Sequence, residues 1–245
     1  MRRTAQAPED MRMADFTPSV SAGIERSASL ADKVYVRLSG SLRFGECLPG
    51  QRLSARRLAK ELDVSLTPVR EAMLRLVSEG ALQIGAKREF RAAKLDLDTY
   101  REVASIRLAL EPLAAGLAAE RISAPALEEL DHLNECLADA IRAEEFGLAP
   151  AFDTQFHQSI YNAAGRPLLY SMIDNLLTRA GPTRTQLSHG YRRTLAGYER
   201  HKTVIDALRS RNARLTSDLI EEDLRLGTTA LLEVLELSQE ERSIV

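Results

Sequence analysis

Four residues in the second half of the chain are of types that bind metal ions, and their spacing suggests a common site. Asp153 and His157 are four residues apart, so on a helix their side chains lie on the same face. His201 and Asp223 fall on two other predicted helices, and side chains from neighbouring helices of a bundle can converge on one internal point. Two carboxylates and two imidazoles are suitable ligands for zinc, manganese, nickel or iron(II). We therefore predict one divalent metal ion, without choosing among these elements.

Each of these residues also has a simpler interpretation. A buried Asp153–His157 pair is more often a structural hydrogen bond than a metal site. His201 lies between two basic residues and could be a surface histidine, whereas Asp223 follows two glutamates and could belong to a solvated acidic face. The sequence pattern alone leaves these alternatives open.

A second group of candidate residues, in the N-terminal third, is suited to nucleic acid. Ser65, Thr67 and Arg70 lie at the start of a predicted helix, and Arg70 follows Thr67 by about one turn, so both project from one side. An arginine can make two hydrogen bonds to guanine, and hydroxyl groups suit phosphates. When such a helix enters the major groove N-terminus first, its first turn meets the bases.

Further basic residues flank this helix in the sequence. Arg56 and Arg57 lie on the preceding predicted helix, within reach of the phosphate backbone. Lys87 and Arg88 lie at the tip of a predicted hairpin, which could approach a phosphate or the minor groove. Taken singly, each is explained as well by ordinary surface charge. Their joint placement on one predicted unit favours DNA binding.

The elements that must position the DNA-binding residues are short. Ser54 is a suitable N-cap for the first of them, and Pro68 is tolerated in the first turn of the second helix. The predicted elements are helix 55–62, a tight break at 63–65, a helix from Thr67 to Gly80, and strands 81–84 and 90–93. Helix, tight turn, helix and hairpin are the order of a winged helix-turn-helix.

The remainder of the chain has an almost wholly helical pattern, with breaks at glycine and proline such as Gly181–Pro182. The candidate helices are 96–121, 124–146, 150–163, 166–180, 190–211 and 213–237. Helices of this length predict an antiparallel bundle. The expected fold is therefore mainly α, an N-terminal winged helix-turn-helix with a small β-hairpin followed by an antiparallel all-α helical bundle.

Charge is distributed unevenly along the chain. The net charge of −2 combines +6 over residues 27–94 with −8 over residues 95–245. A small basic domain joined to an acidic one suits a nucleic-acid binder with a separate second function, although ordinary scatter explains the charge equally well. We expect a flexible arm over residues 1–26, the DNA-binding domain over 27–94 and an effector-binding domain over 95–240.

Composition predicts a cytoplasmic protein without a membrane span. The sequence has no run of about 18 uncharged apolar residues and no apolar region of the secretory type near its start. Cys47 and Cys136 are the only cysteines and form no CxxC motif, so a disulfide framework or a cysteine-based zinc site is not indicated.

The run LSARRLAKELDVSLTPVREAMLRLVSEGAL, and above all its TPVREA string, strongly resembles the N-terminal domain of the GntR family. The resemblance spans about 65 residues, from Leu30 to Lys94, and implies a homodimer that binds a short palindromic operator in double-stranded DNA. Two positions depart from the family pattern. Leu66 stands where the family commonly has arginine, and the wing sequence AKREF, which includes Glu89, lacks the usual glycine.

Residues 96–240 resemble the FCD ligand-binding domain of the FadR subfamily, through the stretches IRLALEPLAAGLAAE, FDTQFHQSIYNAAGRPLL and ERHKTVIDALRSRNA. Many such domains bind a divalent metal through one aspartate and three histidines. Asp153, His157 and His201 match the first three positions, and Asp223 stands at the last histidine position. Asp223 can coordinate a metal, but it is a harder ligand and adds negative charge.

The resemblance also directs attention to Arg107, because similar domains place an arginine there that faces the cavity. A guanidinium beside a metal would hold a carboxylate well, so the implied effector is a small organic acid. Alternatively, Arg107 snorkels at the surface and pairs with Glu111 at i+4.

These features together indicate a transcription regulator rather than an enzyme. A metal-dependent hydrolase or isomerase is less well supported, because the sequence has no evident nucleophile arrangement or HExxH motif. A structural nucleoid protein without an effector would leave the histidine and aspartate set unexplained.

Overall fold

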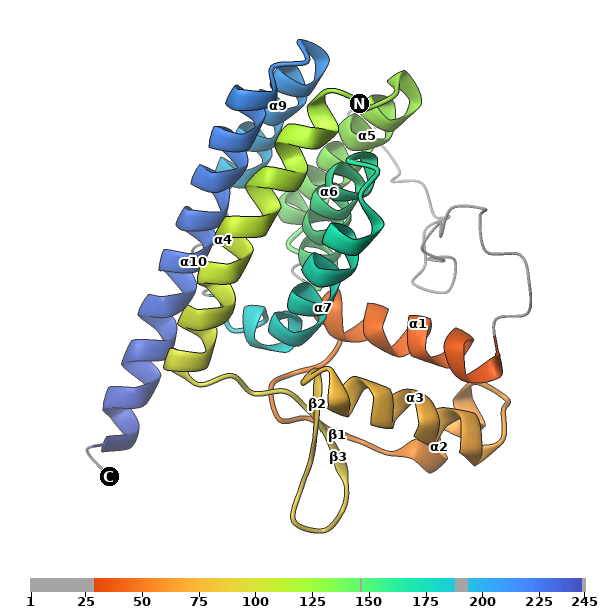
Figure 1. Cartoon of the computed structure of the whole chain (residues 1–245). Helices are drawn as coiled ribbons and strands as arrows, with labels where there is room; N and C mark the ends of the chain where they lie inside the picture. Colours follow the sequence, from red (N-terminus) through yellow and green to blue (C-terminus); the bar gives the residue numbers. More distant parts are fainter. Residues whose placement is uncertain (1–28, 146, 188–193, 244–245) are drawn as a thin grey trace, which may run out of the picture.

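The structure is a computed structural model that describes residues 29–145, 147–187 and 194–243 (Figure 1). The predicted arm over residues 1–26 lies outside the described residues, as do residues 190–193 of the predicted helix 190–211. The described parts are mainly helical, as predicted, with a small sheet near the N-terminal end.

The N-terminal unit is built on helices α1 (Leu30–Arg43), α2 (Ala55–Glu61) and α3 (Leu66–Ser78). The side chain of Ser54 accepts a hydrogen bond from the amide of Arg57, which makes it the N-cap of α2 as predicted. Between α2 and α3, Asp63 turns the chain with a φ of 51°. The apolar faces of the three helices meet in one core, whose fully buried members include Val69, Met73 and Leu76.

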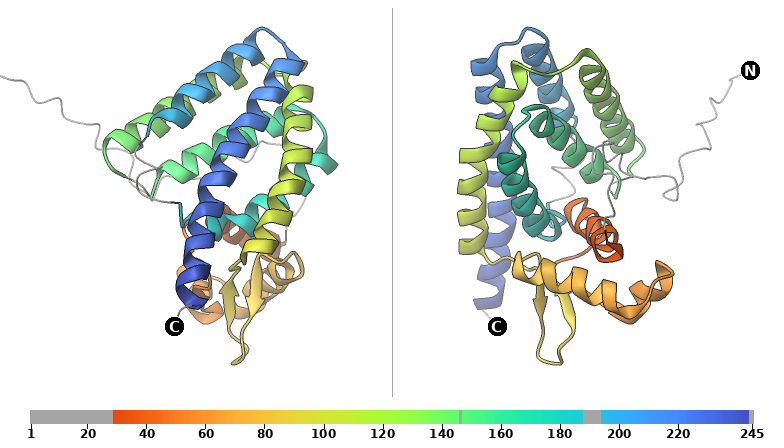
Figure 2. Two further views of the ribbon diagram at one scale, coloured as in Figure 1. Left: turned by 90° about the vertical axis from the view of Figure 1, so that its left-hand side faces the viewer. Right: turned by 45° about the vertical axis from the view of Figure 1, so that its right-hand side comes forward.

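A three-stranded antiparallel sheet follows, in the order β1-β3-β2, formed by β1 (Arg52–Leu53), β2 (Leu82–Ile84) and β3 (Phe90–Ala92). Strands β2 and β3 match the predicted hairpin. Strand β1 was not predicted because its two residues carry no alternating pattern and pair only through the tertiary fold. The hairpin loop projects away from all of the helices, as a wing does (Figures 1 and 2).

The rest of the described chain is a helical bundle. Its members are α4 (Leu97–Ala119), α5 (Ala124–Arg142), α6 (Ala149–Ala163), α7 (Pro167–Arg184), α9 (Ala196–Arg209) and α10 (Ala213–Ser243). The two long helices α4 and α10 run side by side along one flank (Figures 1 and 2). Helix α6 packs against α4, α9 packs against both long helices, and α5 packs on α6 and α9. Buried aromatic side chains such as Phe156 and Tyr161 of α6 fill the centre of this bundle.

The prediction that Gly181–Pro182 ends a helix at residue 180 is wrong, because α7 continues to Arg184. Gly181 is a close-approach residue rather than a terminator. A Cβ atom at this position would lie 2.2 Å from the carbonyl oxygen of Leu42 in α1. Pro182 lies in the last turn of the helix, so the hydrogen bond that its missing amide removes interrupts only the final residues of α7.

Helix α7 joins the bundle to the N-terminal unit. Arg43 of α1 forms an ion pair with Asp174 of α7. Thr183 of α7 accepts a hydrogen bond from the amide of Leu95, in the segment between β3 and α4. A small apolar cluster covers the same junction and is formed by Ala93, Leu95, Tyr100, Val103, Ala104, Ala180, Leu231 and Leu235. Among the described helices none is both long enough and apolar enough to cross a membrane.

Candidate functional site

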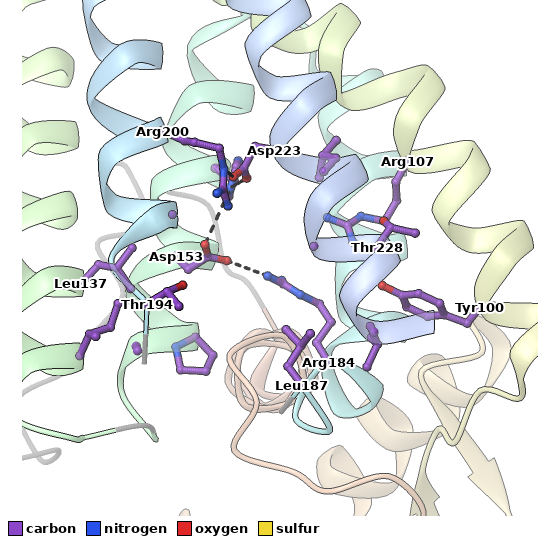
Figure 3. A pocket seen from close by; sticks show the side chains of 18 residues that line it. Tyr100, Arg107, Leu137, Asp153, Arg184, Leu187, Thr194, Arg200, Asp223 and Thr228 are labelled. Carbon is purple, nitrogen blue, oxygen red and sulfur yellow. Dashed lines mark hydrogen bonds and ion pairs between the residues drawn. The ribbon is translucent and has the colours of Figure 1, made fainter. Parts of the chain in front are cut away.

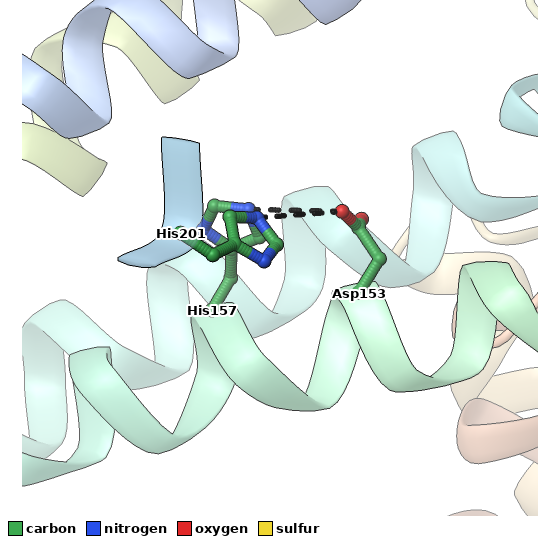
Figure 4. A group of neighbouring side chains, drawn as sticks. All are labelled: Asp153, His157 and His201. Atoms are coloured by element: carbon green, nitrogen blue, oxygen red, sulfur yellow. Dashed lines mark ion pairs between the residues drawn. The ribbon is translucent and has the colours of Figure 1, made fainter. Parts of the chain in front are cut away.

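The four predicted metal ligands lie close together inside the bundle. Asp153 and His157 come from α6, His201 from α9 and Asp223 from α10. The ligand atoms of Asp153, His157 and His201 all lie within 4.8 Å of one another (Figure 4). Oδ2 of Asp223 is 3.2 Å from Nε2 of His157 and 4.0 Å from Nε2 of His201. For comparison, ligands in a tetrahedral zinc site with bonds of about 2.05 Å are about 3.3 Å apart.

Hydrogen bonds orient both imidazoles so that Nε2 faces the site. Nδ1 of His201 lies 3.1 Å from Oδ1 of Asn134, whose amide nitrogen donates to the carbonyl of Tyr198 at 3.0 Å. Asn134 therefore presents its oxygen, and Nδ1 of His201 is the donor. Nδ1 of His157 lies 3.3 Å from the hydroxyl of Tyr161, which itself donates to Glu111 at 2.6 Å. Such second contacts leave the lone pair of each Nε2 for a metal.

One buried atom in this arrangement lacks a hydrogen-bond partner. Nε2 of His201 is buried and makes no hydrogen bond in the described part of the chain. Its nearest acidic oxygens belong to Asp153, at 3.8 Å, and Asp223, at 4.0 Å, which is too far for a hydrogen bond but suitable for two ligands of one ion. An unpaired polar atom in a core is costly, so its placement indicates that a cation fits here.

Electrostatics favour a neutral His201 and ionised aspartates. Burial and the neighbouring His157 lower the pKa of His201 to about 4, so its imidazole is neutral at pH 7. Burial opposes ionisation of Asp153 and Asp223, yet nearby positive groups hold the pKa of each below its ordinary value. Burial also disfavours protonated His157, but the hydrogen bond to Asp223 and the charge of Asp153 raise its pKa overall. A metal would displace that proton.

Two arginines that sequence reasoning did not select pair with the aspartates. Arg184 donates to Oδ2 of Asp153 at 2.7 Å, and Arg200 donates to Oδ1 of Asp223 at 2.7 Å. Each aspartate thus holds an arginine with one oxygen and turns the other toward the histidines. In Figure 3, Arg184 reaches Asp153 from α7 and Arg200 lies beside Asp223.

A cavity of about 130 Å³ adjoins these groups. Its charged lining residues are Arg107, Asp153, Arg184, Arg200 and Asp223, and apolar side chains such as Leu137 and Leu231 form other parts of the wall (Figure 3). Arg107 is buried rather than snorkelling at the surface, and it pairs with the fully buried Glu111, with its Nε 2.5 Å from Oε1. Arg107 therefore pairs with Glu111, as one alternative predicted, and lines the cavity, as the other predicted. Only the predicted surface position is wrong.

Sequence reasoning missed Arg184 and Arg200 for different reasons. Arg184 lay beyond the helix end predicted at residue 180, so it was not placed on any face of the bundle. Arg200 precedes His201 and carries the ordinary marks of a solvated helix residue. Its position 23 residues before Asp223 gave no signal, because the two helices meet only in the tertiary structure.

The predicted DNA-contacting residues lie on an exposed face. Ser65, Thr67 and Arg70 are exposed at the start of α3, whose opposite face is buried. Arg56 and Arg57 are exposed on α2, and Nε of Arg57 donates to Glu61 at 2.6 Å.

The tip of the wing carries Lys87 and Arg88, both exposed. Arg88 has a φ of 55°, a left-handed conformation that favours glycine. The glycine-poor wing therefore keeps its turn by placing Arg88 in this conformation. The side chain of Glu89 is mostly buried, and its Oε1 accepts a hydrogen bond from Arg91 at 2.9 Å.

Two family models match the chain in succession. Residues 30–91 match the model described as "Bacterial regulatory proteins, gntR family", and residues 102–226 match the model described as "FCD domain". The second match covers about half of the chain.

Relatives with curated descriptions are regulators of transcription. The "HTH-type transcriptional regulator McbR" of Escherichia coli (strain K12) is 35% identical over 160 residues, which is 65% of this chain and 72% of that protein. The "HTH-type transcriptional repressor RspR" of the same strain is 30% identical over 128 residues, 52% of this chain and 56% of that protein.

Two solved structures of regulators are similar to this chain in fold. "E. coli McbR/YncC" aligns with a TM-score of 0.78 and 29% identity over 84% of this chain and 99% of that one. A putative GntR regulator from Rhodococcus sp. RHA1 aligns with a TM-score of 0.69 over the same shares, and its 19% identity supports the fold alone.

Proposed function

Since the chain belongs to the GntR family of bacterial regulatory proteins and carries an FCD domain, we propose that a small organic acid, bound beside a divalent metal, controls its affinity for an operator. DNA-binding regulation of transcription is common to the family and to the relatives described above. Those relatives are described as regulators of transcription, which supports a sensing role for the cavity rather than a catalytic one.

The observation that carries the metal proposal is Nε2 of buried His201, which lies between two aspartate oxygens and has no hydrogen-bond partner among the described residues. Asp153, His157, His201 and Asp223 would hold the ion. The metal, when bound, supplies a positive centre that can coordinate a carboxylate oxygen of the effector. Mixed nitrogen and oxygen ligands do not select one element among zinc, manganese, nickel and iron(II).

For the operator we propose a palindrome bound by a homodimer. One winged helix-turn-helix offers limited contact, and two-fold symmetry of the protein would match two half-sites. Ser65, Thr67 and Arg70 would contact the major groove, and Arg56, Arg57, Lys87 and Arg88 the phosphates or the minor groove. The proposed boundary between the DNA-binding domain and the sensing domain lies near residues 94 and 95.

We further propose α7 as the route by which effector binding reaches the DNA-binding domain. At its C-terminal end Arg184 holds the metal ligand Asp153. One to three turns earlier, Gly181 touches the backbone of α1, and Asp174 pairs with Arg43 of α1. A shift of Arg184 on ligand binding would therefore move a helix already locked to α1. Switching requires only that the ligand binds two arrangements of α7 with different affinity.

Elemental analysis of protein purified without chelators tests the metal centre. Wild type is expected to hold about one ion per chain, and His157→Ala and His201→Ala are each expected to lose it. His132→Ala is the matched control, because His132 is an exposed histidine on α5 and is not one of the proposed ligands. Both ligand variants should keep basal DNA binding in gel shifts and lose the response to effector.

The opposite result is also informative. If wild type holds no ion after incubation with a panel of divalent metals, the cluster is a polar ligand pocket. Asp223, the departure from the family pattern, would then be the first residue to exchange for histidine.

A further inference from the structure

The loop at the tip of the wing has a conformation that its own residues do not favour. The amide of Gly85 donates to the carbonyl of Glu89 at 2.8 Å, and the amide of Arg88 donates to the carbonyl of Gly85 at 2.8 Å. These hydrogen bonds close a three-residue hairpin loop over 86–88, whose last residue is left-handed and is usually glycine. Arg88 occupies that position with a φ of 55°, so the loop needs support from other contacts.

Glu89 and Arg91 supply such contacts. Oε1 of Glu89 accepts hydrogen bonds from Nε of Arg91 at 3.1 Å and from Nη2 of the same side chain at 2.9 Å. Nη1 of Arg91 donates to the carbonyl of Gly50 at 3.1 Å, in the segment before β1. The pair therefore connects the wing loop, through β3, to the other side of the sheet.

The carboxylate of Glu89 is folded back against the wing. Its side chain is 11% exposed, and its Oε2 is buried without a hydrogen-bond partner in the described part of the chain. A Cβ atom at Gly85 would lie 2.8 Å from Oε1 of Glu89, so the carboxylate occupies the space that a side chain at position 85 would fill. Because burial of a carboxylate is costly unless it is paired, the hydrogen bonds from Arg91 are what hold it there.

We propose that Glu89 is a positioning residue for DNA binding, which together with Arg91 holds the wing loop in the conformation that presents Lys87 and Arg88 to DNA. The inference rests on the proposed contact of the wing with DNA. A loop that is already held in its bound conformation loses less conformational freedom on binding, so the affinity is higher. A glutamate that faced DNA would instead repel the phosphates. The two roles predict opposite signs for the loss of this side chain.

The sign is measured by fluorescence anisotropy at several salt concentrations, with a labelled duplex that the wild-type protein has selected from a random pool. Glu89→Ala is expected to weaken binding by about threefold or more, although it removes a negative charge. Gly85→Ala should have a similar effect without any change of charge, because its Cβ would displace the carboxylate. Glu128→Ala is the matched control and should leave the affinity unchanged, because Glu128 is exposed on α5 of the bundle. Circular dichroism checks that each variant is folded.

A double-mutant cycle tests whether Glu89 acts through the wing. Lys87→Ala alone should reduce the affinity and lower the salt dependence by about one phosphate contact. In the Glu89→Ala background the same substitution should have a much smaller effect, because Lys87 is no longer held in place.

Two results would contradict this inference in distinguishable ways. Unchanged or tighter binding by Glu89→Ala, with the effect of Lys87→Ala intact, would overturn the role of Glu89 and leave the wing contact standing. If neither Lys87→Ala nor Arg88→Ala changes the affinity or its salt dependence, the wing contact itself is refuted, and the role of Glu89 with it.

Discussion

Replacement of Gly181 by alanine should destabilise the protein, although the same change in most helices does the opposite. Alanine in a helix interior is normally favoured over glycine by about 0.5–1 kcal/mol. At Gly181 the added Cβ would lie 2.2 Å from the carbonyl oxygen of Leu42 and 2.9 Å from Cα of Arg43. Both are backbone atoms, so α1 would have to move away from α7 by about 1 Å to restore normal contact. Overpacking costs about 1–3 kcal/mol, and close approach to backbone atoms places Gly181 in the upper part of that range, about 2–3 kcal/mol. The net loss is therefore about 1–2.5 kcal/mol.

Urea unfolding followed by circular dichroism measures this difference directly. Gly147→Ala is the matched control, because a Cβ at Gly147 meets no atom within 4 Å, and its stability should change by less than about 0.5 kcal/mol. A Gly181→Ala protein as stable as wild type would show that α1 and α7 are not in tight contact. The proposed route from Arg184 to the DNA-binding domain would then lose its support.

Other expectations can be measured on the same protein. Arg70→Ala should weaken specific operator binding by about 1–3 kcal/mol in gel shifts, and unchanged affinity with an intact fold would exclude its base contact. Lys87→Ala should mainly reduce the salt dependence of binding by about one phosphate contact, which a salt series would reveal. Glu111→Ala should cost about 3–5 kcal/mol in urea unfolding because it strands buried Arg107, whereas Asp218→Ala, from an exposed pair, should cost under about 1 kcal/mol. Burial raises the pKa of the Cys47 thiol to about 11. Its alkylation in the folded protein should therefore be very slow at pH 8 and accelerate as the pH approaches 11. Rapid labelling at pH 8, detected by mass spectrometry, would contradict the burial of this thiol.

Local sequence patterns were sufficient for the parts of the site that one helix or one cap determines. The spacing of Asp153 and His157 places both on one face of α6, and Ser54 begins α2 through its own side chain. These relations depend on the helical repeat and on hydrogen bonds within a few residues. Such local relations do not depend on how distant segments of the chain pack.

The parts that failed depend on contacts between distant segments. Glycine followed by proline usually ends a helix, but Gly181 is needed for the approach of α1, which local patterns cannot reveal. Because the helix was predicted to end at residue 180, Arg184 was not included in the predicted site. Whether His201 is exposed or buried likewise depends on Asn134 and Phe156 of other helices, which contact its ring.

The apolar cluster at the junction limits how the DNA-binding domain of this protein can be exchanged for that of another regulator. Ala93 and Leu95 insert among Tyr100, Ala180 and Leu231, so the segment between wing and bundle is part of a shared core rather than a tether. A chimera that joins a DNA-binding domain from another protein at residue 94 would therefore pack different side chains against this cluster and lose its complementary fit. Exchange of DNA-binding domains between relatives should give a folded protein only if α7 and the C-terminal part of α10 are exchanged together with the domain.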